Sequence, residues 1–322
     1  MPESRMKRKR TGIRTRSKEE IRAGNNKEVR GRNSLGARAG KLWGMSVLFF
    51  TALTGSAFGG EREPAGRELL PDVLHKISRY CSARIEYQFG DQRELLDGNT
   101  IVEWILYDDI TGTIHLNREK IQGYVAELAE KYDTYQKPRT FQTSVGDVVT
   151  VNGGSYGWLL DQKQETYMLE HLIRSGARRE RTPEFAHTAA GWSHSDLGDT
   201  YVEIDLTNQQ VWLYVDGVQE VASSCVSGTL TDSGRATPEG TYTISYTQSP
   251  AVLTGPDWNS PVSYWMPFNG GIGLHDASWR SSFGGDIYRY SGSHGCINLP
   301  YQAARTIYRY AYSGMPVICY YR

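Results

Sequence analysis

The residues with the greatest capacity for chemistry lie near the C-terminus, in the stretch SGSHGCINLP over residues 291–300. This stretch places a hydroxyl, an imidazole and a thiol close together, at Ser293, His294 and Cys296. A second imidazole, His275, ends the apolar run GIGL further upstream. A histidine within hydrogen-bond reach of a cysteine lowers the thiol pKa and carries its proton, so these residues favour nucleophilic thiol chemistry.

Three interpretations of Cys296 are open from the residues alone. A cysteine between a glycine and an isoleucine is often a buried, inert small hydrophobe. His275, His294 and Cys296 could bind a metal ion, although no fourth ligand stands at the usual spacing. In the third interpretation Cys296 is a nucleophile, and Gly295 removes bulk beside the thiol and leaves backbone N–H groups free to face a substrate.

The elements that must position these residues belong to a β-rich region that we expect over residues 197–322. Apolar residues alternate in YVEIDLTN, QVWLYVDGVQEV and GTYTISYTQ, and Asp216-Gly217 is a strong hairpin signal. Only YQAARTIYRYAYSG is predicted as a helix, ending at Gly314. We therefore predict a mainly β domain, a sandwich of mixed sheets or a distorted barrel, with the thiol in a strand-to-helix connection.

An α+β region is expected before it, over residues 73–190. Asn117 is a plausible N-cap for a helix in NREKIQGYVAELAEKYDT, and Asp161 and Gly176 would begin and end a second helix. Short strand-like runs with glycine turns lie between these two helices. Residues 61–72 are predicted to be a linker.

The N-terminal residues carry the charge asymmetry of a chain whose formal net charge is zero. Residues 1–42 hold fourteen Lys/Arg against four Asp/Glu, and no charged residue follows from 42 to 60. A basic tail before an apolar segment favours a membrane anchor or signal segment at 43–60, with the rest of the chain outside the cytoplasm. A nucleic-acid arm is the alternative for the basic tail, and we expect no nucleic-acid partner.

The other three cysteines, Cys81, Cys225 and Cys319, are far apart, and no CxxC pair is present. A zinc ribbon is therefore unsupported. An exported protein permits one disulfide among them, but Cys225 and Cys319 lie in strand-like runs that favour buried free thiols.

The spacing of the histidine and cysteine resembles a known family signature. His275, seventeen residues, and then Ser293-His294-Gly295-Cys296-Ile297-Asn298 are similar to the signature of the L,D-transpeptidase catalytic (YkuD-like) family. The likeness extends over about residues 198–321 and includes YWMPFNGGIGLHDASWR and FGG. Upstream, YDTYQKPRTFQTSVGDVVTVNGGSYGWLLDQKQE resembles the peptidoglycan-binding domain that often precedes this catalytic domain.

The resemblance implies acyl transfer on peptidoglycan stem peptides, which serve as donor and acceptor, without a cofactor or metal. Cys296 would attack the third residue of a stem tetrapeptide, release D-Ala and form a 3→3 cross-link through a thioester. An L,D-carboxypeptidase and an inactive wall-binding protein are the alternatives. The resemblance also implies acylation by carbapenems and a role in cell-wall organisation and cell shape.

The same resemblance implies roles for individual residues. His275 would be the general base and acid, oriented by the backbone carbonyl of Asp276. Backbone N–H groups around His294, Gly295 and Cys296 would form the oxyanion hole. Side chains expected to hold the loop or the substrate are Ser293 and Asn298, and those expected either to line the cleft or to lie in the core are Tyr264, Trp265, Trp279 and Phe283.

Overall fold

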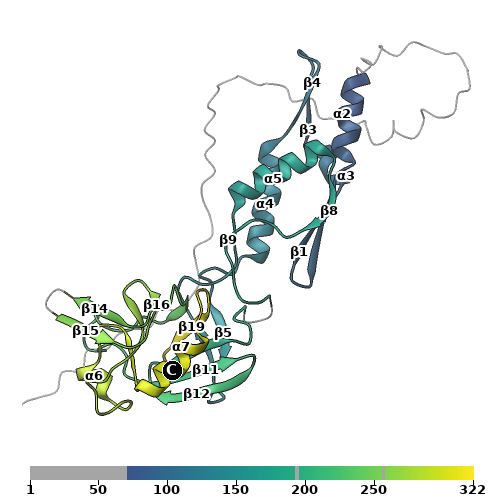
Figure 1. The fold of residues 1–322 in the computed structure, drawn as a ribbon. Coiled ribbons are helices and arrows are strands. Elements are labelled where there is room, and N and C mark those ends of the chain that lie inside the picture. Colours follow the sequence, from purple (N-terminus) through teal and green to yellow (C-terminus); the bar gives the residue numbers. More distant parts are fainter. Residues whose placement is uncertain (1–70, 193–195, 256–257) are drawn as a thin grey trace, which may run out of the picture. The chain divides into compact units, whose positions relative to one another are not determined.

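The computed structural model describes residues 71–192, 196–255 and 258–322 (Figure 1). The predicted basic tail and the predicted anchor or signal segment lie outside these residues. Within them, no helix is both long enough and apolar enough to span a bilayer. The first described helix, α2 (Pro71–Cys81), already begins inside the residues predicted as a linker.

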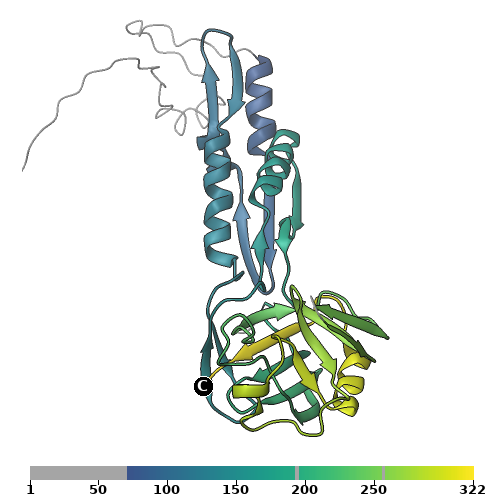
Figure 2. The ribbon, with the colours of Figure 1, turned by 90° about the vertical axis from the view of Figure 1, so that its left-hand side faces the viewer.

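An α+β region comes first, as predicted. A three-stranded sheet of order β2-β1-β8 pairs β1 antiparallel with β2 and parallel with β8. Figures 1 and 2 both show the long helices α4 and α5 running along this sheet. The bounds are β1 Arg84–Phe89, β2 Gln92–Leu96, α3 Gly98–Ile101, β3 Ile105–Asp108, β4 Thr113–Leu116, α4 Arg118–Tyr132, β7 Leu159–Leu160, α5 Gln162–Ser175, β8 Arg178–Arg181 and β9 Phe185–His187.

The capping residues identified in the sequence fix the ends of α4 and α5. The Asn117 side chain accepts a hydrogen bond from the N–H of Lys120, and the Asp161 side chain accepts one from that of Gln164. Gly176 ends α5 in the left-handed conformation, with φ of 68°. Both caps supply acceptors for N–H groups that a helix start leaves without partners, so the predicted helix starts are confirmed.

A buried charge cluster joins α5 to the sheet of this region. Glu165, fully buried, accepts hydrogen bonds from the hydroxyl of Tyr87 at 2.5 Å and from the N–H of Glu184 at 2.8 Å. The guanidinium of Arg181 also binds this carboxylate, and the Arg181 side chain is largely buried. The buried carboxylate is thus neutralised by a direct ion pair, which burial requires.

The second region is mainly β with mixed sheets, which confirms that part of the predicted fold. A five-stranded sheet has the order β12-β11-β10-β19-β13, and a three-stranded sheet has the order β16-β17-β18. Helix α7 contacts β12 and β17 (Figure 1). The bounds are β10 Tyr201–Asp205, β11 Gln210–Val215, β12 Val218–Ser224, β13 Gly240–Thr243, β14 Ala251–Gly255, β15 Trp258–Val262, β16 Trp265–Asn269, β17 Ile272–Asp276, α6 Ile287–Ser291, β18 Ile297–Leu299, α7 Tyr301–Tyr310 and β19 Pro316–Tyr320.

Two local expectations for this region can be compared with the structure, and one helix was not expected. The Asp216-Gly217 hairpin is confirmed, since both residues have positive φ between β11 and β12. Helix α7 ends at Tyr310 rather than at Gly314, because Ala311 already has extended backbone. Helix α6 was not predicted, because its five residues are too short to show helical periodicity.

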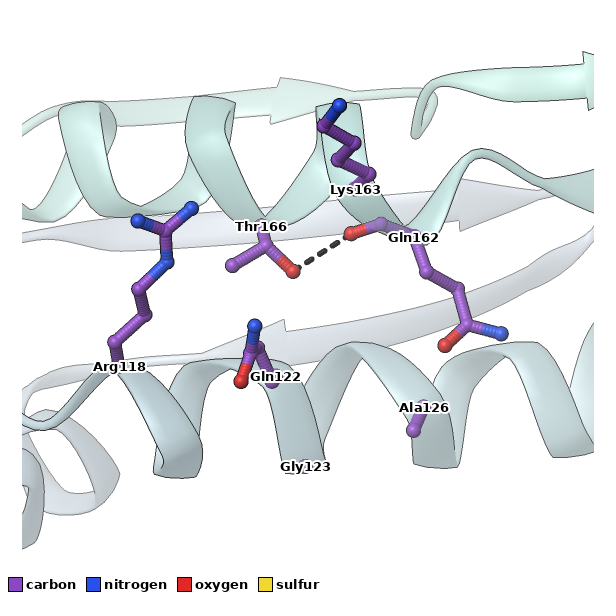
Figure 3. Close-up of a pocket in the computed structure, with 7 residues that line it drawn as sticks. All are labelled: Arg118, Gln122, Gly123, Ala126, Gln162, Lys163 and Thr166. Atoms are coloured by element: carbon purple, nitrogen blue, oxygen red, sulfur yellow. Dashed lines mark hydrogen bonds between the residues drawn. The ribbon is translucent and has the colours of Figure 1, made fainter.

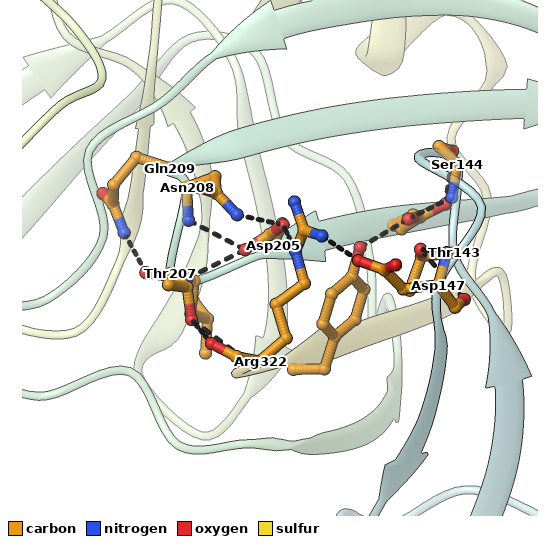
Figure 4. Close-up of polar contacts among 11 residues, drawn as sticks. Thr143, Ser144, Asp147, Asp205, Thr207, Asn208, Gln209 and Arg322 are labelled. Atoms are coloured by element: carbon orange, nitrogen blue, oxygen red, sulfur yellow. Dashed lines mark hydrogen bonds and ion pairs between the residues drawn. The ribbon is translucent and has the colours of Figure 1, made fainter.

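A hairpin of β5 (Arg139–Gln142) and β6 (Val148–Val151) packs on the mainly β region, although it lies within the sequence of the α+β region. Figure 4 shows Ser144 and Asp147 of its turn beside the end of β10 and the C-terminal residue. Ser144 donates from N–H and Oγ to Glu203, and the Arg322 guanidinium binds both Asp205 and Asp147. The apolar cluster beneath contains Phe141, Val151, Tyr156, Leu197, Ile318 and Tyr320.

Candidate active site

The predicted histidine lies in β17, and the predicted cysteine directly precedes the neighbouring strand β18. The two strands pair in parallel, with Leu274 opposite Ile297 and His275 opposite Asn298. Because side chains alternate along a strand, His275 and Asn298 share a face, and Cys296 precedes Asn298 by two residues. The thiol therefore lies at the start of a short strand, and not directly in a strand-to-helix connection as predicted.

The Cys296 thiol is half-buried beneath the β14–β15 hairpin. It packs against an apolar cluster of Ala251, Val262 and Trp265, and its Sγ lies 3.6 Å from the carbonyl oxygen of Gly271. Burial raises the pKa of this thiol above its ordinary value of 9.0, and a hydrogen bond from the backbone N–H of Gly273 partly opposes the rise. Burial therefore favours the protonated thiol over the thiolate.

The imidazole of His275 is 3 % exposed and has a polar partner at each ring nitrogen. Nδ1 lies 2.9 Å from the carbonyl oxygen of Asp276, and Nε2 lies 3.0 Å from Nδ2 of Asn298. Burial lowers the pKa of His275 below 6.5, and the Asp276 carbonyl and carboxylate oppose this change. Among the described residues the Cys296 thiol is not one of its hydrogen-bond partners, since both ring nitrogens are taken by Asp276 and Asn298.

Asp276 contributes to the site through its backbone. Its carboxylate Oδ1 instead accepts the N–H groups of Ser263 and Tyr264, at 2.8 and 2.9 Å. The buried side chain thus fixes the entry into β16, while its carbonyl meets His275.

The loop before Cys296 is held by Ser293. Its Oγ donates to the Cys296 carbonyl at 2.6 Å and accepts the Gly295 N–H at 3.0 Å. Gly295 has φ of +120°, a conformation that favours glycine. Its N–H is occupied by Ser293 and does not face an open position, although it was expected among the oxyanion donors. The His294 side chain is exposed.

Two residues of the site were missed by sequence reasoning. Thr237 is buried, donates from Oγ1 to the Gly295 carbonyl at 2.6 Å and accepts the Gly228 N–H at 2.9 Å. Arg280 donates from Nε to Oδ1 of Asn298 at 2.7 Å. Thr237 is distant in sequence from the signature and carried no signal, whereas Arg280 lies within the HDASWR segment that resembled the family.

The four aromatic residues predicted near the substrate divide between two environments. The rings of Trp265 and Trp279 have centroids 6.0 and 5.8 Å from the His275 ring, and Trp279 is 52 % exposed. Tyr264, in the link between β15 and β16, instead contacts Tyr301 and Tyr308. Phe283 is half-buried, and no ring contact between it and His275 occurs in the described part of the chain. The structure thus brings only the two tryptophans to the imidazole.

The other three cysteines are free thiols, and they lie in different surroundings. Cys225 and Cys319 are fully buried in the β core, and Cys81 is half-buried at the end of α2. Burial raises the pKa of all three thiols. Within the described residues, no group of three or more His, Cys, Asp or Glu side chains is placed to hold a metal ion.

A separate groove of about 470 Å³ lies between α4 and α5 (Figure 3). Its lining has two cationic and two amide side chains but no thiol or imidazole, so it takes no part in the thiol chemistry. The lining residues are Arg118, Gln122, Gly123, Ala126, Gln162, Lys163 and Thr166.

Comparison with known proteins identifies both regions. Residues 199–319 match the family described as "L,D-transpeptidase catalytic domain", and residues 72–180 match "Putative peptidoglycan binding domain". A solved cysteine-to-serine mutant of the Enterococcus faecium L,D-transpeptidase is 30% identical, with a TM-score of 0.63 over 77% of this chain and 100% of that one. The Ldtfm–avibactam carbamoyl enzyme is 31% identical, with a TM-score of 0.64 over 77% and 98%. No curated protein matches the chain.

The resemblance noted in the sequence is therefore confirmed over both regions. The two solved structures are matched over nearly their whole length, so the likeness includes the α+β region as well as the β region that holds Cys296. The chain belongs to the L,D-transpeptidase family, with its catalytic domain at residues 199–319 and a peptidoglycan-binding domain before it at residues 72–180.

Proposed function

We propose that this protein forms 3→3 peptidoglycan cross-links through a thioester on Cys296. The observation that supports it best is that a half-buried thiol directly before β18 packs on the cluster that contains Trp265, and that the Trp265 ring lies 6.0 Å from the buried imidazole of β17. The thiol can supply the nucleophile, and the imidazole can accept its proton.

The chemical steps follow from these positions. Sγ attacks the carbonyl carbon of the third stem residue while the thiol proton passes to Nε2 of His275. The tetrahedral intermediate collapses, the bond to D-Ala breaks, and the imidazolium returns the proton to the leaving amine. The amine of a second stem then attacks the thioester, the new amide forms, and the thiol is restored.

The developing oxyanion needs donors that are free at that moment. Because the Gly295 N–H is held by Ser293, we assign this role to the N–H groups of His294 and Cys296. The Ser293 bonds keep the loop in shape, and the rings of Trp265 and Trp279 border the imidazole where a stem peptide would lie.

Peptidoglycan as substrate places the protein outside the cytoplasm, facing the cell wall. We propose that residues 43–60 provide the export signal or membrane anchor. The cationic tail at 1–42 then lies on the cytoplasmic side and sets topology, with no nucleic-acid partner.

The function is tested by incubating the protein with tetrapeptide muropeptides and separating the products by mass spectrometry. Cross-linked dimers with loss of D-Ala are expected for the wild type, and no products for Cys296→Ala. Cys81→Ser is the matched control, because this half-buried thiol lies outside the catalytic domain, and it should retain full activity. Tripeptide and free D-Ala without dimers would establish the carboxypeptidase instead, and equal turnover by Cys296→Ala would exclude thiol catalysis.

Covalent labelling gives a second measure that does not depend on the natural substrate. Since a similar enzyme is known as its avibactam carbamoyl form, avibactam or a carbapenem should add its mass to the wild type. The adduct should be absent from Cys296→Ala and present in Cys81→Ser. A wild type that forms no adduct and no products would indicate a wall-binding protein without catalysis.

A further inference from the structure

The side chain of Arg280 is the start of a hydrogen-bonded chain that ends at the catalytic imidazole. Its Nε donates to Oδ1 of Asn298 at 2.7 Å, and Nδ2 of Asn298 lies 3.0 Å from Nε2 of His275. Its Nη1 donates to the Ser291 carbonyl at 3.0 Å, which ties the guanidinium to the end of α6. Asn298 and His275 are buried, and Arg280 is half-buried.

The chemistry of these groups leaves one arrangement of protons. A guanidinium only donates, so the atom of Asn298 that faces it must be the acceptor, Oδ1. The amide NH₂ then faces His275, and Nε2 must accept. The proton of the neutral imidazole is therefore on Nδ1, where it is donated to the Asp276 carbonyl. The contact with Asn298 and the contact with the Asp276 carbonyl thus require the same tautomer of His275.

The same chain opposes the protonated imidazole. An imidazolium carries a proton on both nitrogens, so its Nε2–H would point at the NH₂ of Asn298. Asn298 could turn its oxygen towards that proton only by giving up the bond to Arg280. The charged side chains that act on the imidazole are Asp276 of β17 and Arg280. The rings of Trp265 and Trp279 also border it, and the Cys296 thiol packs on the cluster that contains Trp265.

We infer that Arg280 is a positioning residue: acting through Asn298, it holds His275 neutral, with its proton on Nδ1 and its Nε2 lone pair available as the base. This inference rests on the proposed thiol mechanism. In the resting enzyme the Asn298 amide occupies Nε2, and the thiol proton takes its place during attack. The positive charge of Arg280 acts in the same direction, because it lowers the pKa of His275.

The test is Arg280→Met, which removes the donors and the charge but keeps an apolar side chain. Without Arg280, Asn298 is free to turn Oδ1 towards an Nε2–H, so the imidazolium is stabilised. We expect the pKa of His275, followed by NMR of its ring nitrogens in the full-length apo enzyme, to rise. We also expect the acid limb of kcat/KM to move to higher pH, with activity at pH 6 about threefold to tenfold lower.

Two further variants separate positioning from folding. Arg280→Lys keeps a charge and a donor near Asn298 and should leave the His275 titration close to that of the wild type. Arg289→Met in α6 removes an exposed pair with Asp286 and a contact with the Tyr288 ring, neither of which reaches Asn298 or His275, and should change neither readout. An unchanged His275 titration in folded Arg280→Met would overturn the inference. Because the NMR titration needs no turnover, the inference can fail or stand whether or not cross-linking is observed.

Discussion

The two structured regions each bury an arginine-containing network, and they neutralise it in different ways. In the α+β region the guanidinium of Arg181 meets the carboxylate of Glu165 directly, and Tyr87 completes the cluster. In the catalytic domain Arg280 meets the neutral amide of Asn298, which separates it from His275. The first network is a closed ion pair, whereas the second ends at a group that must gain and lose a proton.

This difference indicates what each network is suited to do. In a closed ion pair the two charges satisfy each other and do not change during the reaction. Removing one partner leaves a buried charge unpaired, which destabilises the fold. An amide transmits the direction of hydrogen bonds without supplying a charge, so it can fix the tautomer of its neighbour and keep it neutral. We expect changes in the first network to affect stability and changes in the second to affect pH dependence.

The largest effect is expected from Glu165→Ala. The change removes the buried partner of Arg181, which keeps only the more exposed Glu184, and it takes the acceptor from the Tyr87 hydroxyl and the Glu184 N–H, so the free energy of unfolding should fall by about 3–5 kcal/mol. Chemical denaturation measures this value. Glu170→Ala is the control, because it breaks only a more exposed pair with Arg174 on the same helix and should cost about 0.5 kcal/mol or less. Slower avibactam labelling of folded Glu165→Ala would contradict this division, since the Glu165 network would then also affect the reaction of Cys296.

A smaller effect is expected from Thr237→Val, which keeps the shape of the side chain. The buried Gly228 N–H and Gly295 carbonyl both lose their partner, and the unfolding free energy should fall by about 1–3 kcal/mol. Because Gly295 shapes the loop before the thiol, we also expect slower acylation by avibactam, with the pH at half-maximal rate unchanged. A shifted acid limb in this variant would show that the pH dependence does not belong to the Arg280 network alone.

The most discriminating test is Asn298→Asp, which converts the amide network into a closed ion pair. The carboxylate can accept from Arg280 and from a protonated His275, so the pKa of the imidazole should rise. We expect kcat/KM at pH 6 to fall about tenfold and to recover as the pH is raised. In the wild type burial lowers the His275 pKa below 6.5, so the unfolded chain binds this proton more readily than the folded enzyme does. The free energy of unfolding should therefore fall as the pH falls below 6.5. An unchanged pH profile would show that the charge of residue 298 is irrelevant to the base.

Much of this molecule could be predicted from its sequence because the informative signals were local. The caps at Asn117 and Asp161, the stop at Gly176 and the Asp216-Gly217 turn depend on neighbouring residues, and all were predicted. The spacing from His275 to Cys296 likewise identified the family. In contrast, Thr237 and the β5–β6 hairpin reach their partners through long-range packing, for which a single sequence carries no pattern.

The site itself shows the same division. The Asp276 carbonyl was expected beside His275 because the family resemblance implied it, and the contact is local. The contact of Asn298 with the imidazole could not be predicted from the sequence, because it depends on the parallel register of β17 and β18. That register also determines which atom of Asn298 faces Arg280. The hydrogen bonds that link Arg280, Asn298 and His275 therefore could not be predicted from the sequence.

The internal position of β19 in the five-stranded sheet has a consequence for the order of events during folding. This strand lies between β10 and β13, and its pairing joins Asp205 to Tyr320 across nearly the whole catalytic domain. Contacts between residues so distant in sequence form slowly, because a large loop must close first. The segment that carries both His275 and Cys296 lies inside that loop. The elements that hold His275 and Cys296 in place are therefore complete only after the two ends of the domain have paired.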